Sequence, residues 1–342
     1  MQILQNLVEM TGQRDHLRLE VSVLSTLLQL PHVVNVRALE LSHTTQGTMV
    51  RPRTWLEGER MVTVDSDAPE QMPGIALAEM PLLERCIKDA AQSVEAHPSD
   101  DVYMLWLPVW MHDQAHTCVE ITQTAPFTPQ AVEVLMGVFR VYQNYQSLLD
   151  YSERDALTGL LNRKTFEEQF SRNTPAEASM PASSMQHQIV SDDLPQQWLA
   201  VLDIDHFKQV NDRYGHLFGD EVLILVANLL RTSFRSHDRI FRFGGEEFVI
   251  LLRGLTLADA QRVFERFRSK VEAHEFPQVG CITVSMGFTS TRSGTPVEIL
   301  GQADQALYYA KQNGRNRVCH YGSLIANGEL NTQLKHEDVE LF

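Results

Sequence analysis

Cysteine and long apolar runs are both scarce in this chain of 342 residues. The four cysteines are far apart in the sequence, at Cys86, Cys118, Cys281 and Cys319. This spacing matches neither a disulfide framework nor a set of metal ligands, so we expect reduced thiols and a cytoplasmic protein. No stretch approaches the ~18 consecutive apolar residues of a membrane-spanning helix, and the apolar run 102–111 is interrupted by Pro108. The first residues lack the basic region of a signal peptide, so we expect no membrane partner.

Basic residues are also few. The 29 lysines and arginines are outnumbered by 44 aspartates and glutamates, which gives a net charge of −15. Nucleic-acid polymers are bound through basic faces, so this charge argues against a nucleic-acid polymer as partner. With 43% hydrophobic residues, the chain is long enough for two domains that each bury a core.

The most informative stretch is 242–252, where two strand-like segments flank the pair Gly244-Gly245. Glycine adopts a positive φ without steric cost, so this pair predicts a tight hairpin turn that a bulky anion can approach. Glu246 and Glu247 follow the glycines directly. The sequence therefore predicts a hairpin that presents carboxylates at its tip.

A second acidic strand end lies upstream. The apolar segment 198–205 finishes in Asp203 and Asp205 and is expected to be buried in a sheet. Mg²⁺ prefers oxygen ligands and is usually held by one or two carboxylates plus the phosphates of a substrate. Acidic strand ends are ordinarily just solvated, but two of them in one chain indicate a site for a hard cation.

These residues belong to a wider pattern. The segment 244–248 reads Gly-Gly-Glu-Glu-Phe, and five further segments stand in a fixed order around it, at 155–163, 203–212, 214–220, 285–287 and 303–315. Over roughly residues 150–322 the chain resembles the GGDEF-type diguanylate cyclases, which join two GTP molecules into cyclic di-GMP. The resemblance implies an α+β domain with the ferredoxin-like palm of nucleotidyl cyclases.

The resemblance also implies a metal site. Asp203 and Glu246 correspond to the side-chain ligands of one or two Mg²⁺ ions, with Mn²⁺ as a possible substitute, and the Ile204 carbonyl corresponds to a main-chain ligand. Glu246 is also the proposed proton acceptor of the family, although one carboxylate can hardly be a ligand and a strong base together. Glu247 is expected to be a second ligand or an orienting neighbour.

The implied GTP site draws on several segments. Lys208 corresponds to a lysine that contacts the phosphates, and Asn211 and Asp220 correspond to the pair that reads guanine, for which their hydrogen-bonding groups are suited. Helix capping is the plainer alternative for this pair. The remaining expected substrate contacts are Phe207, His216, Gly244, Gly245, Lys311 and Arg315.

A control site is implied just before the hairpin. Arg235 and Asp238 match the Arg-x-x-Asp motif of the family, called the inhibitory site, which binds the product cyclic di-GMP. Arginine forms bidentate bonds to phosphate or to a guanine edge, and aspartate accepts from guanine. Arg262 and Arg266 are further candidates, as the contribution of a partner subunit to this site. The alternative is a surface ion pair.

Residues 1–128 show a mixture of helices and strands that resembles a GAF-type sensory domain, with a PAS-like domain as the alternative. A helical pattern opens the chain, and a further helix is expected at 81–95. Strands are expected at 33–41, 49–55, 61–64, 102–110 and 116–122. The ligand of this domain is not indicated. Trp106, Trp110 and Met111 are expected in the core, with a pocket lining as the alternative.

Residues 129–154 are predicted to form a helical linker. The apolar residues Ala131, Leu135, Val138, Tyr142, Tyr145 and Leu149 alternate in steps of four and three, as in a coiled coil. Each cyclase domain binds one GTP, so a parallel helix pair in a homodimer would bring two GTP molecules face to face. A single helix lying on its own domain is the alternative.

The cyclase domain is thus predicted at 155–322, interrupted by a Ser/Pro/Gln-rich insertion at 173–197, and followed by a mobile tail at 323–342. The predicted reaction converts two GTP into cyclic di-GMP and two pyrophosphates, with product inhibition and control by the N-terminal domain. The alternative function is a catalytically silent receptor for cyclic di-GMP or GTP that acts through protein partners.

Overall fold

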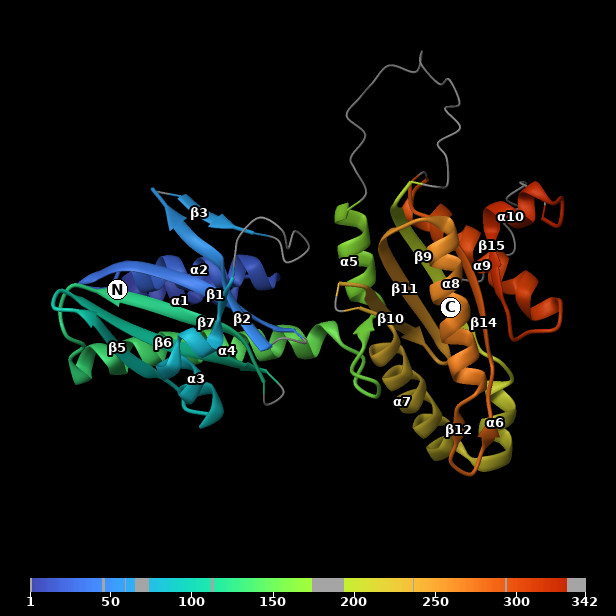
Figure 1. The fold of residues 1–342 in the computed structure, drawn as a ribbon, viewed down its shortest axis with the longest axis horizontal. Helices are drawn as coiled ribbons and strands as arrows, with labels where there is room; N and C mark the ends of the chain where they lie inside the picture. The colour runs from blue at the N-terminus through green and yellow to red at the C-terminus, as the bar shows by residue number, and fades with distance from the viewer. Residues whose placement is uncertain are drawn as a thin grey trace, which may run out of the picture. The chain divides into compact units, whose positions relative to one another are not determined.

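The computed structural model describes residues 2–330 except 45–46, 59, 65–73, 112–113, 174–193, 236 and 293. The chain divides into two compact units, Met1–Ser152 and Glu153–Phe342 (Figure 1). Within the described ranges, no helix is both long enough and apolar enough to cross a membrane.

The first unit is built on a seven-stranded antiparallel sheet with the order β3-β2-β1-β7-β6-β5, in which β4 pairs with β2. Its strands are β1 (Val33–Thr44), β2 (Gly47–Glu57), β3 (Arg60–Thr63), β4 (Ile75–Ala76), β5 (Val94–Ser99), β6 (Val102–Met111) and β7 (Gln114–Gln123). Its helices are α1 (Gln2–Thr11), α2 (His16–Leu28), the 3₁₀ turn η1 (Leu77–Glu79), α3 (Pro81–Lys88) and α4 (Pro129–Glu153).

Strand β6 shows how this sheet buries both faces. Side chains alternate between the two faces of a strand. Leu105, Leu107 and Val109 therefore join the core beneath α1, α2 and α4, whereas Trp106 and Trp110 join a second core with α3. All five expected strands are present in the described residues. Membership of the GAF or PAS family stays a prediction.

The expected helix at 81–95 is shorter than predicted. Helix α3 ends at Lys88, and Ala90 takes a left-handed φ of 50° that an α-helix cannot continue. The Ala91 amide then bonds back to the Cys86 carbonyl at 2.9 Å, which closes the helix end. Residues 94–99 form the edge strand β5 instead, a strand that the sequence pattern did not reveal.

Helix α4 lies on its own domain, and the predicted coiled-coil face is the face that it buries. Leu135, Val138, Tyr142 and Leu149 are between 1% and 6% exposed and pack into the core under the sheet. The Tyr145 hydroxyl also donates to the Thr11 carbonyl of α1. A coiled coil through this face is therefore wrong for the described fold, and the alternative of a helix packed on its own unit is correct.

The second unit has the β-α-β-β-α-β order of a ferredoxin-like fold, as predicted. Its sheet has the order β15-β14-β9-β11-β10-β8, in which the four central strands are antiparallel to one another and the edge strands β15 and β8 run parallel to β14 and β10. The strands are β8 (Leu161–Asn162), β9 (Gln196–Ile204), β10 (Arg239–Gly244), β11 (Glu247–Leu255), β14 (Val284–Ser290) and β15 (Val318–His320), with a separate hairpin of β12 (Glu275–Phe276) and β13 (Gly280–Cys281). The helices are α5 (Arg163–Asn173), α6 (Phe207–Tyr214), α7 (His216–Ser233), α8 (Leu257–Glu272), α9 (Pro296–Gln312) and α10 (Tyr321–Ala326).

Helices cover both faces of this second sheet. Side chains of α7 and α8 pack against one face, and side chains of α5 and α9 pack against the other. Gly287 in β14 allows α9 to approach closely, because a Cβ there would lie 2.1 Å from the Ala303 carbonyl. This contact fixes the helix that brings Lys311 to the sheet edge.

The C-terminal boundary lies further along the chain than expected. Helix α10 covers part of the predicted mobile tail, and Leu324 is buried with Ala306 and Ala310 of α9. The predicted insertion lies at 174–193 outside the described residues, as does the remaining tail at 331–342. Residues 196–197, expected in the insertion, begin strand β9.

Candidate active site

The two acidic strand ends meet at one edge of the second sheet. Asp203, near the end of β9, stands opposite Glu247 of β11 on one side and Ser285 of β14 on the other. Strand β9 is almost entirely buried, which explains its continuous apolar sequence. Ile204 is the last residue of β9 and is 1% exposed. The register of the sheet thus places Asp203 directly beside the Gly-Gly turn.

The turn itself is held by an arginine. Gly245 has a φ of 50°, and its carbonyl accepts from Arg242 Nε at 3.2 Å and from Nη2 at 2.9 Å. Arg242 Nη1 also donates to Asp155 Oδ1 at 2.8 Å. Burial opposes ionisation of Asp155, but hydrogen bonds from Thr158 and Arg242 outweigh it and hold the pKa of Asp155 below its usual range. The segment 155–163 therefore braces the hairpin.

A lysine from α9 is the partner of Asp203. Lys311 Nζ lies 2.8 Å from Asp203 Oδ2, and the Asp203 side chain is 8% exposed. Burial raises the pKa of Asp203 to about 6, because the charges of Glu246 and Glu247 add to the desolvation and outweigh Lys311. Asp203 is therefore a buried carboxylate with negative neighbours and a single cationic partner among the described residues.

Asp304 completes the acidic surroundings, and the sequence analysis missed it. Desolvation by the surrounding protein raises the pKa of Glu247 and that of Asp304, although both residues keep exposed surface. The negative charge of Asp304 raises the pKa of Glu247 further. Lys311 lies seven residues, about two helical turns, after Asp304 on α9. That spacing on one helix face is the signal that could have revealed Asp304.

These residues fit a Mg²⁺ site that is completed by a substrate. Within the described residues, no three acidic, histidine or cysteine side chains form a ready-made metal cage. Mg²⁺ needs none, because it is commonly held by one or two carboxylates with phosphate oxygens and water. Asp203 and Glu246 would hold the ion, and the mutual repulsion of these carboxylates favours a cation between them.

Asp205 has a different role from Asp203. Its carboxylate accepts from Thr283 Oγ1 and Ser285 Oγ, each at 2.7 Å, and from the backbone N–H of Asn316 at 3.0 Å. Hydrogen bonds within the protein therefore use the acceptor sites of this carboxylate. Asp205 therefore fastens the loop after α9, in which Arg315 has a left-handed φ of 60°. The expected triphosphate contact Arg315 is positioned by this loop.

The expected guanine-reading residues meet at the corner between α6 and α7. A Cβ on Gly219 would lie 1.9 Å from Asn211 Oδ1, so the Asn211 carboxamide rests directly on the backbone of α7, next to Asp220. Asp220 is exposed and lies inside α7, whose N-cap is Gly215, so the capping alternative for Asp220 is wrong. The structure thus brings these two residues to one corner.

Three further expected contacts lie on the same two helices. Lys208 lies exposed in the first turn of α6, directly after the buried Phe207. His216 is the first residue of α7 and is also exposed.

The expected control site forms a small hollow at the other end of β10 from the Gly-Gly turn. The hollow measures about 100 Å³, and Arg235, Asp238 and Arg266 line it together with Phe234 and Leu255. The Asp238 carboxylate accepts from the Arg235 amide at 2.9 Å. Six residues of β10 separate the hollow from the turn, a span of about 20 Å.

Arg262 does not line this hollow. Its guanidinium donates to Asp259 of the same helix, and its side chain is 77% exposed. The structure therefore brings together Arg235, Asp238 and Arg266 of one chain, and the contribution of a partner subunit stays a prediction.

Comparisons with known proteins show which family this part of the chain resembles. Residues 152–317 match the family model described as diguanylate cyclase, GGDEF domain. The chain is 42% identical over 168 residues to the diguanylate cyclase DgcP of Pseudomonas aeruginosa, a match that covers 48% of this chain and 23% of DgcP. It is 38% identical over 168 residues to the diguanylate cyclase DgcM of Escherichia coli K12, covering 49% of this chain and 38% of DgcM.

Among solved structures, the GGDEF domain of DgcB from Caulobacter crescentus in complex with c-di-GMP matches with 33% identity and a TM-score of 0.42. That match covers 50% of this chain and 96% of the DgcB domain. The chain spans less than two thirds of the length of the two curated relatives that it matches.

Proposed function

Because residues 152–317 form a GGDEF domain, we propose that this chain is a diguanylate cyclase that converts two GTP into cyclic di-GMP and two pyrophosphates. One observation carries the proposal. The sheet register sets Asp203 opposite Glu247 beside the Gly-Gly turn, and Lys311 reaches Asp203 at 2.8 Å. A turn open to phosphate, the buried carboxylate of Asp203, the exposed carboxylate of Glu247 and a cation therefore converge at one sheet edge.

The chemistry of phosphoryl transfer requires such a site. When a ribose 3′-hydroxyl attacks an α-phosphate, negative charge builds on the phosphoryl oxygens and the hydroxyl loses its proton. Mg²⁺ held by Asp203 and Glu246 supplies positive charge to the phosphate oxygens. Positive charge at the phosphates also comes from Lys208, Lys311 and Arg315. The Gly244-Gly245 backbone leaves room for the phosphates.

Guanine recognition is assigned to the corner between α6 and α7. Asp220 can accept from the N1–H and the exocyclic amine of guanine, and Asn211 offers both a donor and an acceptor. Gly219 supports this assignment, because only a residue without a side chain leaves the Asn211 carboxamide next to Asp220. His216 and Phe207 complete the proposed GTP site.

The reaction needs two copies of the chain, since each domain holds one GTP. On its exposed face, α4 carries Val134 and Leu148 at one heptad position and Gly137, Asn144 and Tyr151 at the other, whereas Val141 is partly buried against the core of the first unit. Val134, Leu148 and Tyr151 are 40%, 56% and 74% exposed. We assign the homodimer contact to this face, because its apolar residues repeat as the seam of a coiled coil requires.

Product inhibition is assigned to the hollow at the start of β10. Two arginines and one aspartate around about 100 Å³ suit a ligand that carries both phosphates and guanine edges. Cyclic di-GMP is such a ligand. The first unit is assigned a sensory role on the basis that α4 runs from its core directly into the cyclase unit.

A turnover assay distinguishes the cyclase from the silent receptor. The purified full-length chain is incubated with GTP and Mg²⁺, and the products are separated by chromatography and weighed by mass spectrometry. The cyclase predicts cyclic di-GMP and pyrophosphate in a 1:2 ratio. Binding of GTP or cyclic di-GMP without any turnover would contradict the cyclase and favour the receptor.

A further inference from the structure

The first unit contains a cavity of about 310 Å³ that the proposed cyclase reaction does not use. Its lining comes from the turn after α3, from the end of β6 and from α4: Ala90, Gln92, Pro108, Trp110, Met136, Phe139, Arg140 and Gln143. The volume exceeds that of ten waters at about 30 Å³ each, so it admits a small organic molecule. The lining mixes aromatic and aliphatic walls with a few polar groups, which is typical of ligand sites.

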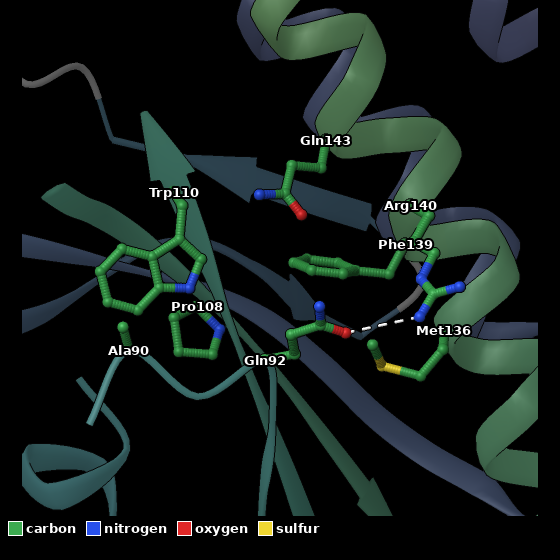
Figure 2. Close-up of a pocket in the computed structure, with 8 residues that line it drawn as sticks. All are labelled: Ala90, Gln92, Pro108, Trp110, Met136, Phe139, Arg140 and Gln143. Carbon is green, nitrogen blue, oxygen red and sulfur yellow. Dashed lines mark hydrogen bonds between the residues drawn. The ribbon is translucent and has the colours of Figure 1, made fainter. Parts of the chain in front are cut away.

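One buried hydrogen-bond donor of this cavity lacks an acceptor among the described residues. The Trp110 indole Nε1–H is buried and has no hydrogen-bond partner among the described residues. Leaving a buried donor unpaired is costly in a folded protein. Figure 2 shows this N–H edge and the Gln143 carboxamide pointing toward the same space, beside the ring of Phe139. A ligand that brings an acceptor to this space would satisfy the Trp110 N–H.

The charge of the lining is positive. Arg140 forms no ion pair with a described residue, and among these residues it donates one long hydrogen bond, of 3.4 Å, to Gln92 Oε1 (Figure 2). None of the lining residues is acidic. Asp89, which precedes the lining residue Ala90, pairs with Arg85 at 3.5 Å. The guanidinium at the rim is therefore available to an anion.

We propose that the first unit binds a small aromatic carboxylate in this cavity. The carboxylate accepts from Arg140, and the aromatic body lies against Phe139, Pro108 and Met136 with its ring face toward the Trp110 N–H at the other end of the cavity (Figure 2). An arginine fork binds carboxylates with strong, charge-assisted bonds, and the apolar walls bury the ring.

The regulatory part of this inference rests on the proposed cyclase function. Four of the lining residues lie on α4, and this helix continues to Glu153, where the cyclase unit begins. A ligand that holds Arg140 and Phe139 therefore biases the position of the helix that leads into the cyclase. Binding of the carboxylate should change the turnover of GTP, with a sign set by which position of α4 it favours.

A matched pair of probes tests the binding. Phenylacetate carries the proposed carboxylate, and phenylacetamide has nearly the same shape without the charge. Tryptophan fluorescence and thermal shift titrations of the full-length chain should show saturable binding of phenylacetate, with phenylacetamide at least about tenfold weaker. Arg140→Gln should abolish this preference, and Trp110→Phe should weaken binding of phenylacetate while keeping the ring. Arg85→Gln, an exposed arginine next to the cavity, is the control and should bind as the unmodified chain does.

Two outcomes would overturn the inference. One is the absence of saturable phenylacetate binding to the unmodified chain, and the other is equal binding to folded Arg140→Gln. Circular dichroism and the melting temperature establish that each variant is folded. Because fluorescence reads binding without GTP, a chain that binds phenylacetate but makes no cyclic di-GMP would contradict the cyclase function alone. A chain that makes cyclic di-GMP but ignores phenylacetate would contradict this inference alone.

Discussion

Lys311 Nζ lies 2.8 Å from Asp203 Oδ2, and this ion pair joins the last turn of α9 to the end of the central strand β9. Asp203 is surrounded by further carboxylates, and Lys311 is the only described cation that contacts it. The lysine thus balances the buried charge of Asp203. In the proposed reaction Asp203 would hold Mg²⁺, and Lys311 would contact the phosphates.

We predict that Lys311→Met lowers kcat/KM for GTP by about ten- to a hundredfold, since a charge-assisted contact contributes about 1.5–3 kcal/mol. Initial rates of cyclic di-GMP formation over a range of GTP concentrations measure the effect. Lys164→Met is the matched control, because Lys164 is 72% exposed on α5 and pairs only weakly with Glu168, at 3.8 Å. Equal loss in both variants would remove Lys311 from the site.

The raised pKa of Asp203 predicts a pH-dependent stability. The folded-state pKa of about 6 exceeds the usual 3.8, so the folded protein holds this proton more tightly and loses stability as the pH rises from about 4 through 6. Asp203→Asn should therefore stabilise the EDTA-treated protein at pH 7.5. The gain should be about 1–3 kcal/mol, reduced by the loss of the Lys311 partner, and should vanish as the pH approaches 4.

Urea unfolding at several pH values measures this gain. The conservative variant Asp205→Asn serves as a contrast, because Asp205 accepts three hydrogen bonds and its replacement should destabilise the protein at pH 7.5. If Asp203→Asn were less stable than the unmodified chain at pH 7.5, the ionised Asp203 carboxylate would stabilise the fold, which would contradict the prediction.

Gly219→Ala should weaken GTP binding while the fold survives. The new Cβ would displace the end of the Asn211 side chain, 1.9 Å away, and a side-chain end can move at little cost. The displaced carboxamide no longer reads guanine, so KM for GTP should rise about tenfold or more. Gly301→Ala on α9 is the control, because a Cβ there meets nothing within 4 Å and should leave KM unchanged.

Leu148→Glu should convert the proposed homodimer into monomers. Leu148 is 56% exposed on the outer face of α4, and a pair of carboxylates at a helix seam repels. Light scattering after size exclusion measures the mass, and turnover should fall with the dimer. Val297→Glu, at a 67% exposed position of the cyclase unit, should stay dimeric. A dimeric Leu148→Glu variant would show that another surface makes the contact.

Arg235→Ala should relieve product inhibition with little change in the initial rate. The hollow lies about 20 Å from the Gly-Gly turn, and the variant removes its main charged donor. Progress curves should slow in the unmodified chain as cyclic di-GMP accumulates, whereas the variant should continue toward GTP exhaustion. Arg262→Ala should behave as the unmodified chain, because Arg262 turns to Asp259. If the progress curves of the unmodified chain and of both variants had the same curvature, Arg235 and Asp238 would not form an inhibitory site.

Much of the site could be predicted from the sequence because its residues lie in short segments with fixed spacing. Asp203, Gly244, Gly245 and Glu246 mark strand ends, and the sheet register then brings them together. Asp304 escaped prediction, because its place depends on how α9 packs through Gly287 and not on neighbours in sequence.

The orientation of α4 escaped prediction for a different reason. One of its faces alternates apolar residues in steps of three and four through Leu135 and Tyr142, and a second face carries Val134, Leu148 and Tyr151 at heptad-related positions. Periodicity shows that a helix has an apolar face, but it does not show whether a sheet of the same chain or a second helix covers that face. The structure assigns the face through Leu135 to the core of the first unit.

The most direct test of the account compares the initial rate of cyclic di-GMP formation in the unmodified chain and in Glu246→Gln, with Mg²⁺ and saturating GTP. The proposed metal site predicts a loss of at least about a hundredfold in Glu246→Gln, with an unchanged melting temperature, because one charged contact to the cation and its phosphates disappears. A folded Glu246→Gln variant that forms cyclic di-GMP at a rate near that of the unmodified chain would contradict the account.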